Sequence, residues 1–191
     1  GVYHIEPDTN CFAFVGDSTF FASAITGVVN AVYNQAEMTL IVLDNSTTAM
    51  TGHQPHPGTG QTMMGEVVAK VSIEAVLRGI GLTAVETVNP MEHEKAVETV
   101  LRVAAEPGVK AVIFKYPCIA ITRPSDSMTV DAEKCIGCHR CVNEIGCPAL
   151  YYADGSDKRS KVLIDQSQCT GCTLCSQLCP TKAIVHAGKE A

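Results

Sequence analysis

The sequence lacks the features that would place the protein in a membrane, outside the cell or on nucleic acid. Its longest apolar runs are far shorter than the ~20 residues that a membrane-spanning helix needs. No basic segment followed by an apolar one opens the chain, as a secretory signal would. Lys and Arg total 14 against 20 Asp and Glu, and this net charge of -6 leaves no basic stripe for nucleic acid. We therefore expect a cytoplasmic protein with no membrane or nucleic-acid partner.

The length of 191 residues suffices for one domain of medium size and one small domain. Residues 1–127 carry 7 Lys and Arg against 13 Asp and Glu, whereas residues 128–191 carry 7 of each kind. The opening residues, GVYHIEPDTN, resemble the interior of a fold. We therefore expect the chain to be a fragment of a longer polypeptide.

Cysteine is abundant and unevenly placed. Eight of the ten cysteines lie between Cys135 and Cys179. Disulfides are not expected in a chain without a secretory signal, because the cytosol keeps thiols reduced. Clustered cysteines in such a chain indicate metal binding. The other two, Cys11 and Cys118, have apolar neighbours and are predicted to be buried structural residues.

The cysteine-rich segment contains an internal duplication. VDAEKCIGCHRC (residues 130–141) and IDQSQCTGCTLC (residues 164–175) match at a constant offset of 34. Each is an apolar residue, an Asp, three residues and then C-x-G-C-x-x-C. Each continues to a Cys-Pro pair, after five intervening residues in the first copy and three in the second. Two copies predict two equivalent sites.

The cysteine spacing favours iron–sulfur clusters over zinc, which commonly takes two C-x-x-C pairs. Three cysteines at i, i+3 and i+6 with a fourth before proline are typical of bacterial two-cluster ferredoxins, where the fourth cysteine binds the other cluster. Gly137 and Gly171 are expected to let the backbone pass close to the cluster sulfides. Zinc remains the alternative. The predicted ligand sets of the two [4Fe-4S] clusters are Cys135, Cys138, Cys141 and Cys179, and Cys147, Cys169, Cys172 and Cys175.

The preceding part of the chain alternates strand and helix patterns. Continuous apolar runs predict strands at residues 11–15, 38–44, 82–88 and 109–116. Helices are expected at residues 20–35, 65–78 and 89–106, the last with an Asn cap followed by proline. This order predicts an α/β domain with an open, mostly parallel sheet and helices on both faces.

Short strands flank the two cysteine runs, and residues 154–161 read as a polar surface turn. We therefore expect a small α+β domain of the bacterial two-[4Fe-4S] ferredoxin type. The predicted organisation is an α/β domain at residues 1–117, a linker at 118–127 and a ferredoxin-like domain at 128–191.

Polar residues follow two strands of the predicted sheet. Gly16, Asp17 and Ser18 end the first strand, and Asn45 follows the second, 29 residues after Gly16. Ligands of open α/β sheets bind at the carboxyl ends of strands. An Asp and an Asn at neighbouring strand ends can both offer oxygen to Mg²⁺, which also takes phosphate oxygens. The helix after Ser18 points free N–H groups toward such an anion.

This spacing resembles the thiamine-diphosphate motif, a Gly-Asp-Gly followed about thirty residues later by an Asn, with Ser18 in place of the second Gly. The longer stretches GDSTFFASAITGVVNAVYN and LDNSTTAMTGHQPHPGTG, followed by a two-cluster segment, resemble the large subunit of indolepyruvate:ferredoxin oxidoreductases. The resemblance covers nearly the whole chain and implies a thiamine-diphosphate-binding fold.

The resemblance also implies roles for individual residues. Asp17, the Asn45 side chain and the Thr47 carbonyl would bind Mg²⁺, while Gly16 and Ser18 would contact the diphosphate. The loop of residues 48–54 would close over the cofactor, with four contacting residues: Thr48, Met50, Thr51 and Gly52. Two histidines of this loop region, His53 and His56, are candidates for acid–base roles.

Two departures from the family pattern concern the segment FFASA, where the family commonly has FFHSG. Ala22 replaces a His that could touch substrate or cofactor, and Ala24 replaces a Gly, which bears on substrate preference. The family's aminopyrimidine-binding part and its activating Glu have no counterpart here. Glu66, Glu74 and Glu86 all lie in the same predicted domain. The catalytic residue is therefore expected outside this chain, in the remaining amino-terminal domains of the same subunit or in a partner subunit.

The resemblance implies oxidative decarboxylation of an aryl pyruvate, such as indolepyruvate, to an acyl-coenzyme A. Electrons would pass through the two clusters to ferredoxin, and a smaller beta subunit would complete the enzyme. One alternative is a pyruvate or branched-chain 2-oxo-acid:ferredoxin oxidoreductase. Another is a non-catalytic iron–sulfur electron-transfer subunit whose α/β domain has lost its cofactor.

Overall fold

The computed structural model describes residues 1–122, 125–153 and 160–188. The chain divides into two compact units, Gly1–Ile121 and Thr122–Ala191. The boundary falls inside the expected linker of residues 118–127, which also contains the short 3-10 helix η3 (Ile119–Ile121). Within the described ranges, no helix is both long and apolar enough to cross a bilayer.

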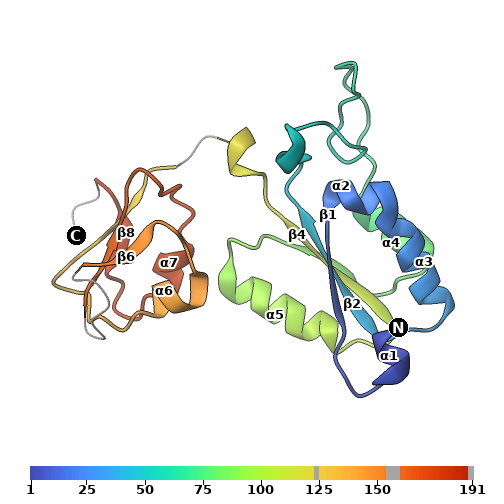
Figure 1. The fold of residues 1–191 in the computed structure, drawn as a ribbon, viewed down its shortest axis with the longest axis horizontal. Helices are drawn as coiled ribbons and strands as arrows, with labels where there is room; N and C mark the ends of the chain where they lie inside the picture. The colour runs from blue at the N-terminus through green and yellow to red at the C-terminus, as the bar shows by residue number, and fades with distance from the viewer. Residues whose placement is uncertain (123–124, 154–159, 189–191) are drawn as a thin grey trace. The chain divides into compact units, whose positions relative to one another are not determined.

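A four-stranded parallel sheet forms the centre of the first unit (Figure 1). Its spatial order is β1-β2-β4-β3, and all three neighbouring pairs are parallel. The strands are β1 (Phe12–Gly16), β2 (Met38–Asp44), β3 (Val85–Val88) and β4 (Val109–Lys115). In the register, Gly16 lies opposite Leu43 and Asp44 opposite Lys115, so β1 and β2 end side by side. The predicted parallel α/β fold is confirmed.

Helices cover both faces of this sheet (Figure 1). On one face lie α2 (Asp17–Thr19), α3 (Ile25–Tyr33) and α4 (Ile73–Ile80), and on the other lies α5 (His93–Ala104). The larger core layer lies on the first face and includes Phe20, Val42 and Leu77, all fully buried. Val103 and Val112 belong to the layer under α5. Burial of such side chains contributes about 1.5–3 kcal/mol each. A further short helix, α1 (Val2–Ile5), precedes β1.

The helix predicted after β1 contains a π-helical turn. α2 continues without a break through η1 (Phe20–Ala24), which is π-helical, into α3. Single π turns inside α-helices occur often at functional sites. Ala22 and Ala24 both lie on this turn, the first exposed and the second half-buried.

The helix predicted at residues 65–78 was wrong in its first half. α4 begins only at Ile73, where the Ser72 hydroxyl caps it by accepting from the Ala75 N–H at 3.2 Å. Residues 61–67 instead form a hairpin that is closed by a bridge between Gln61 and Val67. Gly65 adopts φ 91°, which a helix cannot use, so the apolar residues of this segment do not lie on a helix face.

The helix predicted at residues 89–106 also starts later. The Asn89 side chain accepts the Met91 N–H at 2.9 Å, and the Glu92 N–H donates to the Asn89 carbonyl at 3.1 Å. The Asn-Pro pair therefore makes a turn before the helix, and α5 begins at His93.

In the second unit, the described residues form two antiparallel strand pairs and two short helices. β5 (Met128–Val130) pairs with β8 (Ile184–His186), and β6 (Leu150–Tyr152) pairs with β7 (Val162–Ile164). α6 (Arg140–Ile145) and α7 (Leu174–Gln177) pack against each other. Of the predicted polar turn at residues 154–161, residues 154–159 lie outside the described ranges. The small α+β domain predicted here is confirmed.

The duplication governs the whole second unit. Adding 34 to the first residue of β5, α6 and β6 gives the first residue of β7, α7 and β8. The first copy has two more residues than the second before its Cys-Pro pair, and two fewer between that pair and the strand that follows. The copies interlock, because the first strand of each pairs with the last strand of the other. Each Cys-Pro pair precedes such a last strand and therefore lies beside the other copy.

Candidate functional site

The carboxyl ends of β1 and β2 meet at the buried carboxylate of Asp17, whose side chain is 4% exposed. Its Oδ1 accepts the Ser18 N–H at 2.7 Å, and its Oδ2 accepts the Ser46 N–H at 2.8 Å. The second contact joins residues 29 apart in sequence and fixes the loop after β2 against the loop after β1. The structure thus brings together the two strand ends that the sequence singled out.

The Asn45 and Thr47 pair forms a tight turn beside this carboxylate. Asn45 Oδ1 accepts the Thr47 N–H at 3.2 Å, and Thr47 is buried. The Asn45 carbonyl accepts the Cys118 N–H at 2.9 Å, which links the turn to the segment after β4. An amide oxygen keeps a second lone pair while accepting one bond. Asn45 therefore retains an acceptor that a cation could use.

The space beside Gly16 and Ser18 is open on one side and bounded by the next loop on the other. A Cβ placed on Gly16 would meet no atom within 4 Å, so the backbone there leaves room for a ligand. The Thr48 hydroxyl donates to the Ser18 hydroxyl at 3.0 Å. Gly16, Ser18 and Thr48 therefore border the same space at the end of β1.

The tip of the second loop lies outside this cluster. Three of the predicted cofactor contacts, Met50, Thr51 and Gly52, are exposed around the 3-10 helix η2 (Ala49–Thr51). The Thr51 hydroxyl donates to the side-chain oxygen of Gln54 at 2.7 Å. His53 is also exposed and has a positive φ of 63°. The role of these residues toward the cofactor stays a prediction.

His56 lies in the cluster, which sequence reasoning did not foresee. Its side chain is 5% exposed, and its Nε2 lies 3.1 Å from Asp17 Oδ2. Because the His56 side chain is buried, a substrate could contact it only if the loop rearranged. The loop sequence HQPHPG contains two histidines, and nothing in it distinguishes the buried one from the exposed one.

Ser46 and Asp44 are further members of the site that the sequence did not reveal. The Ser46 N–H is shared between Asp17 Oδ2 and Asp44 Oδ1, the latter at 3.1 Å. Ser46 has a positive φ of 62°, a conformation that favours glycine or asparagine, so its identity gave no signal. Asp44 also pairs with Lys115 at 3.3 Å across β2 and β4. These contacts hold the backbone that positions Asp17.

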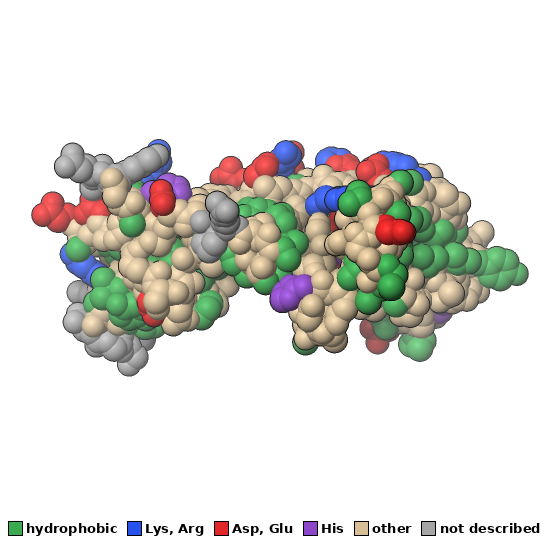
Figure 2. Space-filling model, turned by 90° about the horizontal axis from the view of Figure 1, so that it is seen from above, with side chains coloured by type: hydrophobic (Ala, Val, Ile, Leu, Met, Phe, Trp, Pro, Cys, Tyr) green, Lys and Arg blue, Asp and Glu red, His purple; other side chains and the backbone are tan. Residues whose placement is uncertain are grey.

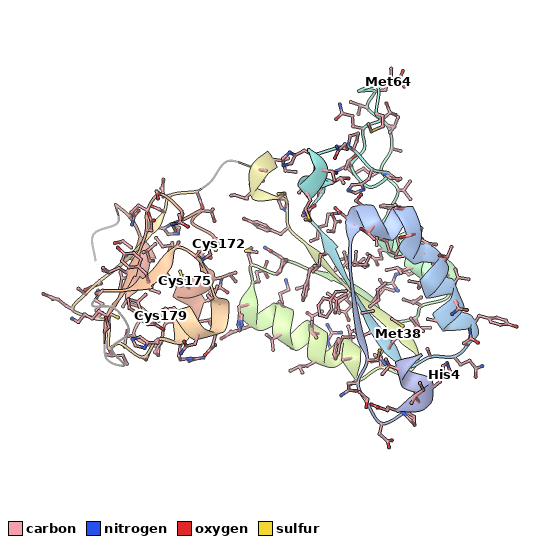
Figure 3. The ribbon with its side chains drawn as sticks, viewed as in Figure 1. His4, Met38, Met64, Cys172, Cys175 and Cys179 are labelled. Carbon is pink, nitrogen blue, oxygen red and sulfur yellow. The ribbon has the colours of Figure 1, made fainter. Side chains whose placement is uncertain are left out.

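Apolar side chains are exposed around this edge of the sheet. Figure 2 looks onto the carboxyl ends of the strands and shows hydrophobic side chains gathered there beside a few charged ones. The exposed ones include Met50 on the loop after β2 and Met63, Met64 and Val67 on the hairpin. Figure 3 shows Met64 at the tip of that hairpin, pointing away from the sheet.

The first predicted set of cluster cysteines lines a single cavity of the second unit. Cys135, Cys138, Cys141 and Cys179 all face it. Burial raises the pKa of the Cys141 thiol, and the nearby sulfurs of Cys138 and Cys179 act in the same direction. For Cys179, burial opposes ionisation, but bonds from Thr181 and backbone N–H groups outweigh it and lower its pKa.

The second predicted set gathers around Cys175, which Figure 3 labels beside Cys172 in the second unit. Burial raises the pKa of Cys175 to about 12, and the nearby sulfurs reinforce the shift. Those sulfurs belong to Cys172, Cys169, Cys141 and Cys147. Cys141 and Cys147, both from the first copy, therefore lie near the second cysteine loop. The buried Cys175 thiol stays protonated near neutral pH until a metal displaces the proton.

Within the described ranges, no three His, Cys, Asp or Glu side chains are arranged to hold a single ion. Thiolates of a cubane bind four different irons, whereas zinc draws four ligands to one point. The remaining cysteines, Cys11 and Cys118, are only half-buried, so the expectation that both are buried was wrong.

The two glycines of the cysteine loops adopt the left-handed conformation, with φ 64° at Gly137 and 70° at Gly171. A Cβ at Gly171 would lie 2.4 Å from the Asp126 carbonyl oxygen and 2.4 Å from the Ser125 hydroxyl. This glycine therefore admits a neighbouring segment of the same unit, and the predicted approach of its backbone to the cluster sulfides stays a prediction.

Two family models match the two units. Residues 1–114 match the model "Thiamine pyrophosphate enzyme, C-terminal TPP binding domain", and residues 134–183 match "4Fe-4S dicluster domain". The first covers more than half of the chain, and the second contains all eight clustered cysteines. The boundary between the matches agrees with the boundary between the two compact units.

Three relatives share the name "Indolepyruvate oxidoreductase subunit IorA". The chain is 45% identical over 183 residues to that of Methanothermobacter marburgensis, covering 93% of this chain and 28% of the relative. It is 44% identical over 193 residues to that of Archaeoglobus fulgidus, covering 98% and 30%. For Pyrococcus horikoshii the identity is 38% over 176 residues, covering 88% and 26%. The chain thus spans less than a third of the length of these curated relatives.

Proposed function

Because the chain belongs to the family of C-terminal thiamine pyrophosphate-binding domains of thiamine enzymes, we propose that it carries the diphosphate site and both clusters of a 2-oxo-acid:ferredoxin oxidoreductase. One observation carries the proposal: a thiamine-cofactor domain and a two-cluster domain are consecutive on one chain. A thiamine enzyme that simply protonates its product has no use for two clusters. The alternative of an electron-transfer subunit that has lost its cofactor is disfavoured, because the side chains around Asp17 still form a polar site.

The overall reaction must balance two electrons. A 2-oxo acid and coenzyme A yield an acyl-coenzyme A, CO₂ and a proton, and two one-electron acceptors such as ferredoxin are reduced. Bound thiamine diphosphate supplies the electron sink for decarboxylation. The two clusters of the second unit accept electrons one at a time and deliver them to the external carrier.

The residues at the end of β1 fit a Mg²⁺-diphosphate group. Asp17, the Asn45 side chain and the Thr47 carbonyl are oxygen donors of the kind that Mg²⁺ prefers. The open space beside Gly16 can admit the diphosphate, and Ser18 with Thr48 borders it. A buried carboxylate beside an anionic diphosphate would be repelled without a cation. Asp17 is therefore assigned to the metal, and the exposed loop from Met50 to Gly52 to closure over the cofactor.

The clusters are assigned to the two cysteine sets as they gather in the second unit. Cys135, Cys138, Cys141 and Cys179 hold one cubane, and Cys147, Cys169, Cys172 and Cys175 hold the other. The interlocked strand pairs support this exchange of the fourth ligand. A reducing compartment suits eight free thiolates, so we place the protein in the cytoplasm.

Indolepyruvate and related aryl pyruvates are the proposed substrates, since the relatives that match bear that name. The activating Glu, the aminopyrimidine half of the site and a smaller beta subunit are assigned to polypeptide outside this chain. Ala22, on the π-helical turn, would leave space where the family carries a larger side chain. The proposal therefore includes an altered fit to the aryl group.

Steady-state rates of the whole enzyme test the substrate. The native complex is assayed with indolepyruvate, phenylpyruvate and pyruvate, with coenzyme A and either ferredoxin or a viologen as acceptor. The proposal expects the highest kcat/KM with an aryl pyruvate. A clear preference for pyruvate would place the protein in the alternative substrate class. Purified protein that contains no thiamine diphosphate, and whose activity does not depend on adding it, would favour the electron-transfer subunit.

A further inference from the structure

The buried imidazole of His56 has one nitrogen without a settled partner. Its Nε2 lies 3.1 Å from Asp17 Oδ2, which is ion-pair distance. The same buried nitrogen nevertheless has no hydrogen-bond partner of acceptable alignment. Buried polar atoms are almost always paired, and those that are not point to a missing ligand or an incomplete site. His56 therefore faces Asp17 at close range without a hydrogen bond that would account for its burial.

The hydrogen bond of the other ring nitrogen indicates the tautomer of the neutral imidazole. Nδ1 of His56 accepts the Gly58 N–H at 3.2 Å, so it carries no proton. In a neutral imidazole the proton then resides on Nε2, which becomes a donor. A protonated nitrogen cannot ligate a metal. The imidazole N–H thus faces Asp17 at 3.1 Å without an aligned hydrogen bond, and in this tautomer His56 does not offer that nitrogen to the cation.

The ring is also held in place by its neighbours. Phe21, on the π-helical turn, packs on it with centroids 5.7 Å apart and planes 30° apart. A Cβ on Gly58 would lie 3.0 Å from the Phe21 ring and 3.1 Å from the His56 ring. The Thr59 hydroxyl donates to the His56 carbonyl at 2.8 Å. The imidazole is therefore wedged between the helix after β1 and its own loop.

The contacts of Asp17 account for three of the four lone-pair positions of an ionised carboxylate. Oδ1 accepts from the Ser18 N–H, and Oδ2 accepts from the Ser46 N–H. His56 Nε2 lies 3.1 Å from Oδ2 and covers its second position, although the contact is not an aligned hydrogen bond. Only one position remains, and it lies on Oδ1.

From this geometry we infer that His56 is a positioning residue of the cation site, which leaves Oδ1 of Asp17 as the single oxygen offered to the metal. The inference rests on the proposed function, because it assigns a role within the Mg²⁺-diphosphate site. It adds that the carboxylate binds through one oxygen and that the imidazole holds the other. Loss of the imidazole uncovers one side of Oδ2, which the Ser46 N–H alone then holds.

The test uses the whole enzyme complex and three variants. His56→Phe keeps a ring of similar size without a donor, and His56→Gln restores an amide donor of similar reach. His4→Phe is the matched control, because His4 is exposed on α1 at the amino end of the sheet (Figure 3). Apparent dissociation constants for thiamine diphosphate are measured by equilibrium dialysis over a Mg²⁺ series. Iron content is recorded to show that the second unit is intact.

We expect His56→Phe to weaken metal-dependent cofactor binding by about 10–100-fold, as loss of an outer partner of a metal ligand does. His56→Gln should recover most of this loss, and His4→Phe should behave as wild type. Wild-type affinity in His56→Phe, while Asp17→Asn abolishes binding, would overturn the inference and leave the proposed function standing. Absence of cofactor binding by wild type would instead contradict the proposed function.

A measurement on the wild-type enzyme avoids any dependence on variant folding. Mn²⁺ replaces Mg²⁺, and pulsed electron paramagnetic resonance detects nitrogen bound directly to the ion. The inference predicts no coordinated imidazole nitrogen. A strong coupling to a histidine nitrogen that disappears in His56→Gln would show His56 to be a ligand and would overturn it.

Discussion

The backbone N–H of Ser46 donates to Oδ2 of Asp17 over 2.8 Å and ties the end of β2 to the end of β1. The bond fixes the loop after β2 to a carboxylate that follows β1. It can form because β1 and β2 are parallel neighbours whose ends coincide, with Gly16 opposite Leu43. The same carboxylate is the centre of the proposed cation site, so folding of the loop and formation of the site are coupled.

Replacement of Asp17 should remove the cofactor without disturbing the clusters. Asp17→Asn keeps the size of the side chain but removes the charge that the cation needs, and we expect a loss of at least 100-fold in thiamine diphosphate affinity. The cofactor retained by the purified complex and its iron content are the two measurements. Asp8→Asn, at an exposed position, is the control. Normal retention by Asp17→Asn would place the site elsewhere.

The exchange of the fourth ligand can be tested with pairs of variants. Each single Cys→Ser change should lower iron from about eight to about four per chain, because one cubane holds four irons. Cys147→Ser combined with Cys172→Ser should lose no more iron, since both belong to one cluster. Cys147→Ser combined with Cys138→Ser should lose nearly all of it.

The control for these variants is Cys118→Ser, which should keep its full iron content. The contradicting result would be the opposite pattern of additive iron loss. If Cys147→Ser adds to Cys172→Ser but not to Cys138→Ser, each copy holds its own cluster and the crossed assignment fails.

Gly171→Ala should destabilise the second unit more than Gly146→Ala. Both glycines have positive φ, 70° and 62°, so each substitution carries about 1 kcal/mol of backbone strain. Only at Gly171 would the new Cβ meet protein atoms at 2.4 Å, whereas none lies within 4 Å at Gly146. The rate of iron loss on mild heating, measured as the decrease of the cluster absorbance, ranks the two variants. Equal rates would show that the contact with Ser125 and Asp126 relaxes freely.

The pair Glu37–Lys110 should give the first unit part of its pH dependence. The pKa of Glu37 is lowered, chiefly by the hydrogen bond from Lys110 at 3.1 Å, although burial opposes this. The folded pKa is therefore below the unfolded value of about 4.3, and the stabilisation is present above that pH. It is lost as the pH falls through the folded pKa.

We expect Glu37→Gln to lower the free energy of unfolding by about 0.5–1 kcal/mol at pH 7, a modest figure because Glu37 is partly exposed. Urea titrations followed by circular dichroism at pH 7 and below pH 4 give the comparison, with Glu6→Gln as the control. A difference that persists unchanged below pH 4 would show that the hydrogen bond with Lys110 is not its source.

Much of the architecture could be predicted because apolar runs such as MTLIVLD and the repeated cysteine pattern report on local, periodic constraints. The predicted β2 and the observed strand share the same bounds, Met38–Asp44. The hairpin at residues 61–67 could not be predicted, since Met63 and Met64 are apolar yet exposed and a positive φ at Gly65 ends the helical option.

The candidate site was predictable only where residue identity carries the chemistry. Asp17 and Asn45 are recognisable from their place at strand ends and from the resemblance to indolepyruvate:ferredoxin oxidoreductases, which the relatives confirm. The burial of His56 was not predictable, because it results from packing on Phe21, 35 residues earlier in the sequence. Ser46 contributes through its backbone N–H, which every residue but proline possesses.

The central claim is that electrons from a 2-oxo acid reach the clusters of this chain through bound thiamine diphosphate. Anaerobic rapid mixing of the native complex with indolepyruvate, with the cluster absorbance recorded in the absence of ferredoxin, tests it most directly. The account predicts bleaching of the clusters in the cofactor-loaded wild type, and none in Asp17→Asn with its full iron content. Clusters that stay oxidised in the loaded wild type, or that bleach equally in Asp17→Asn, would contradict it.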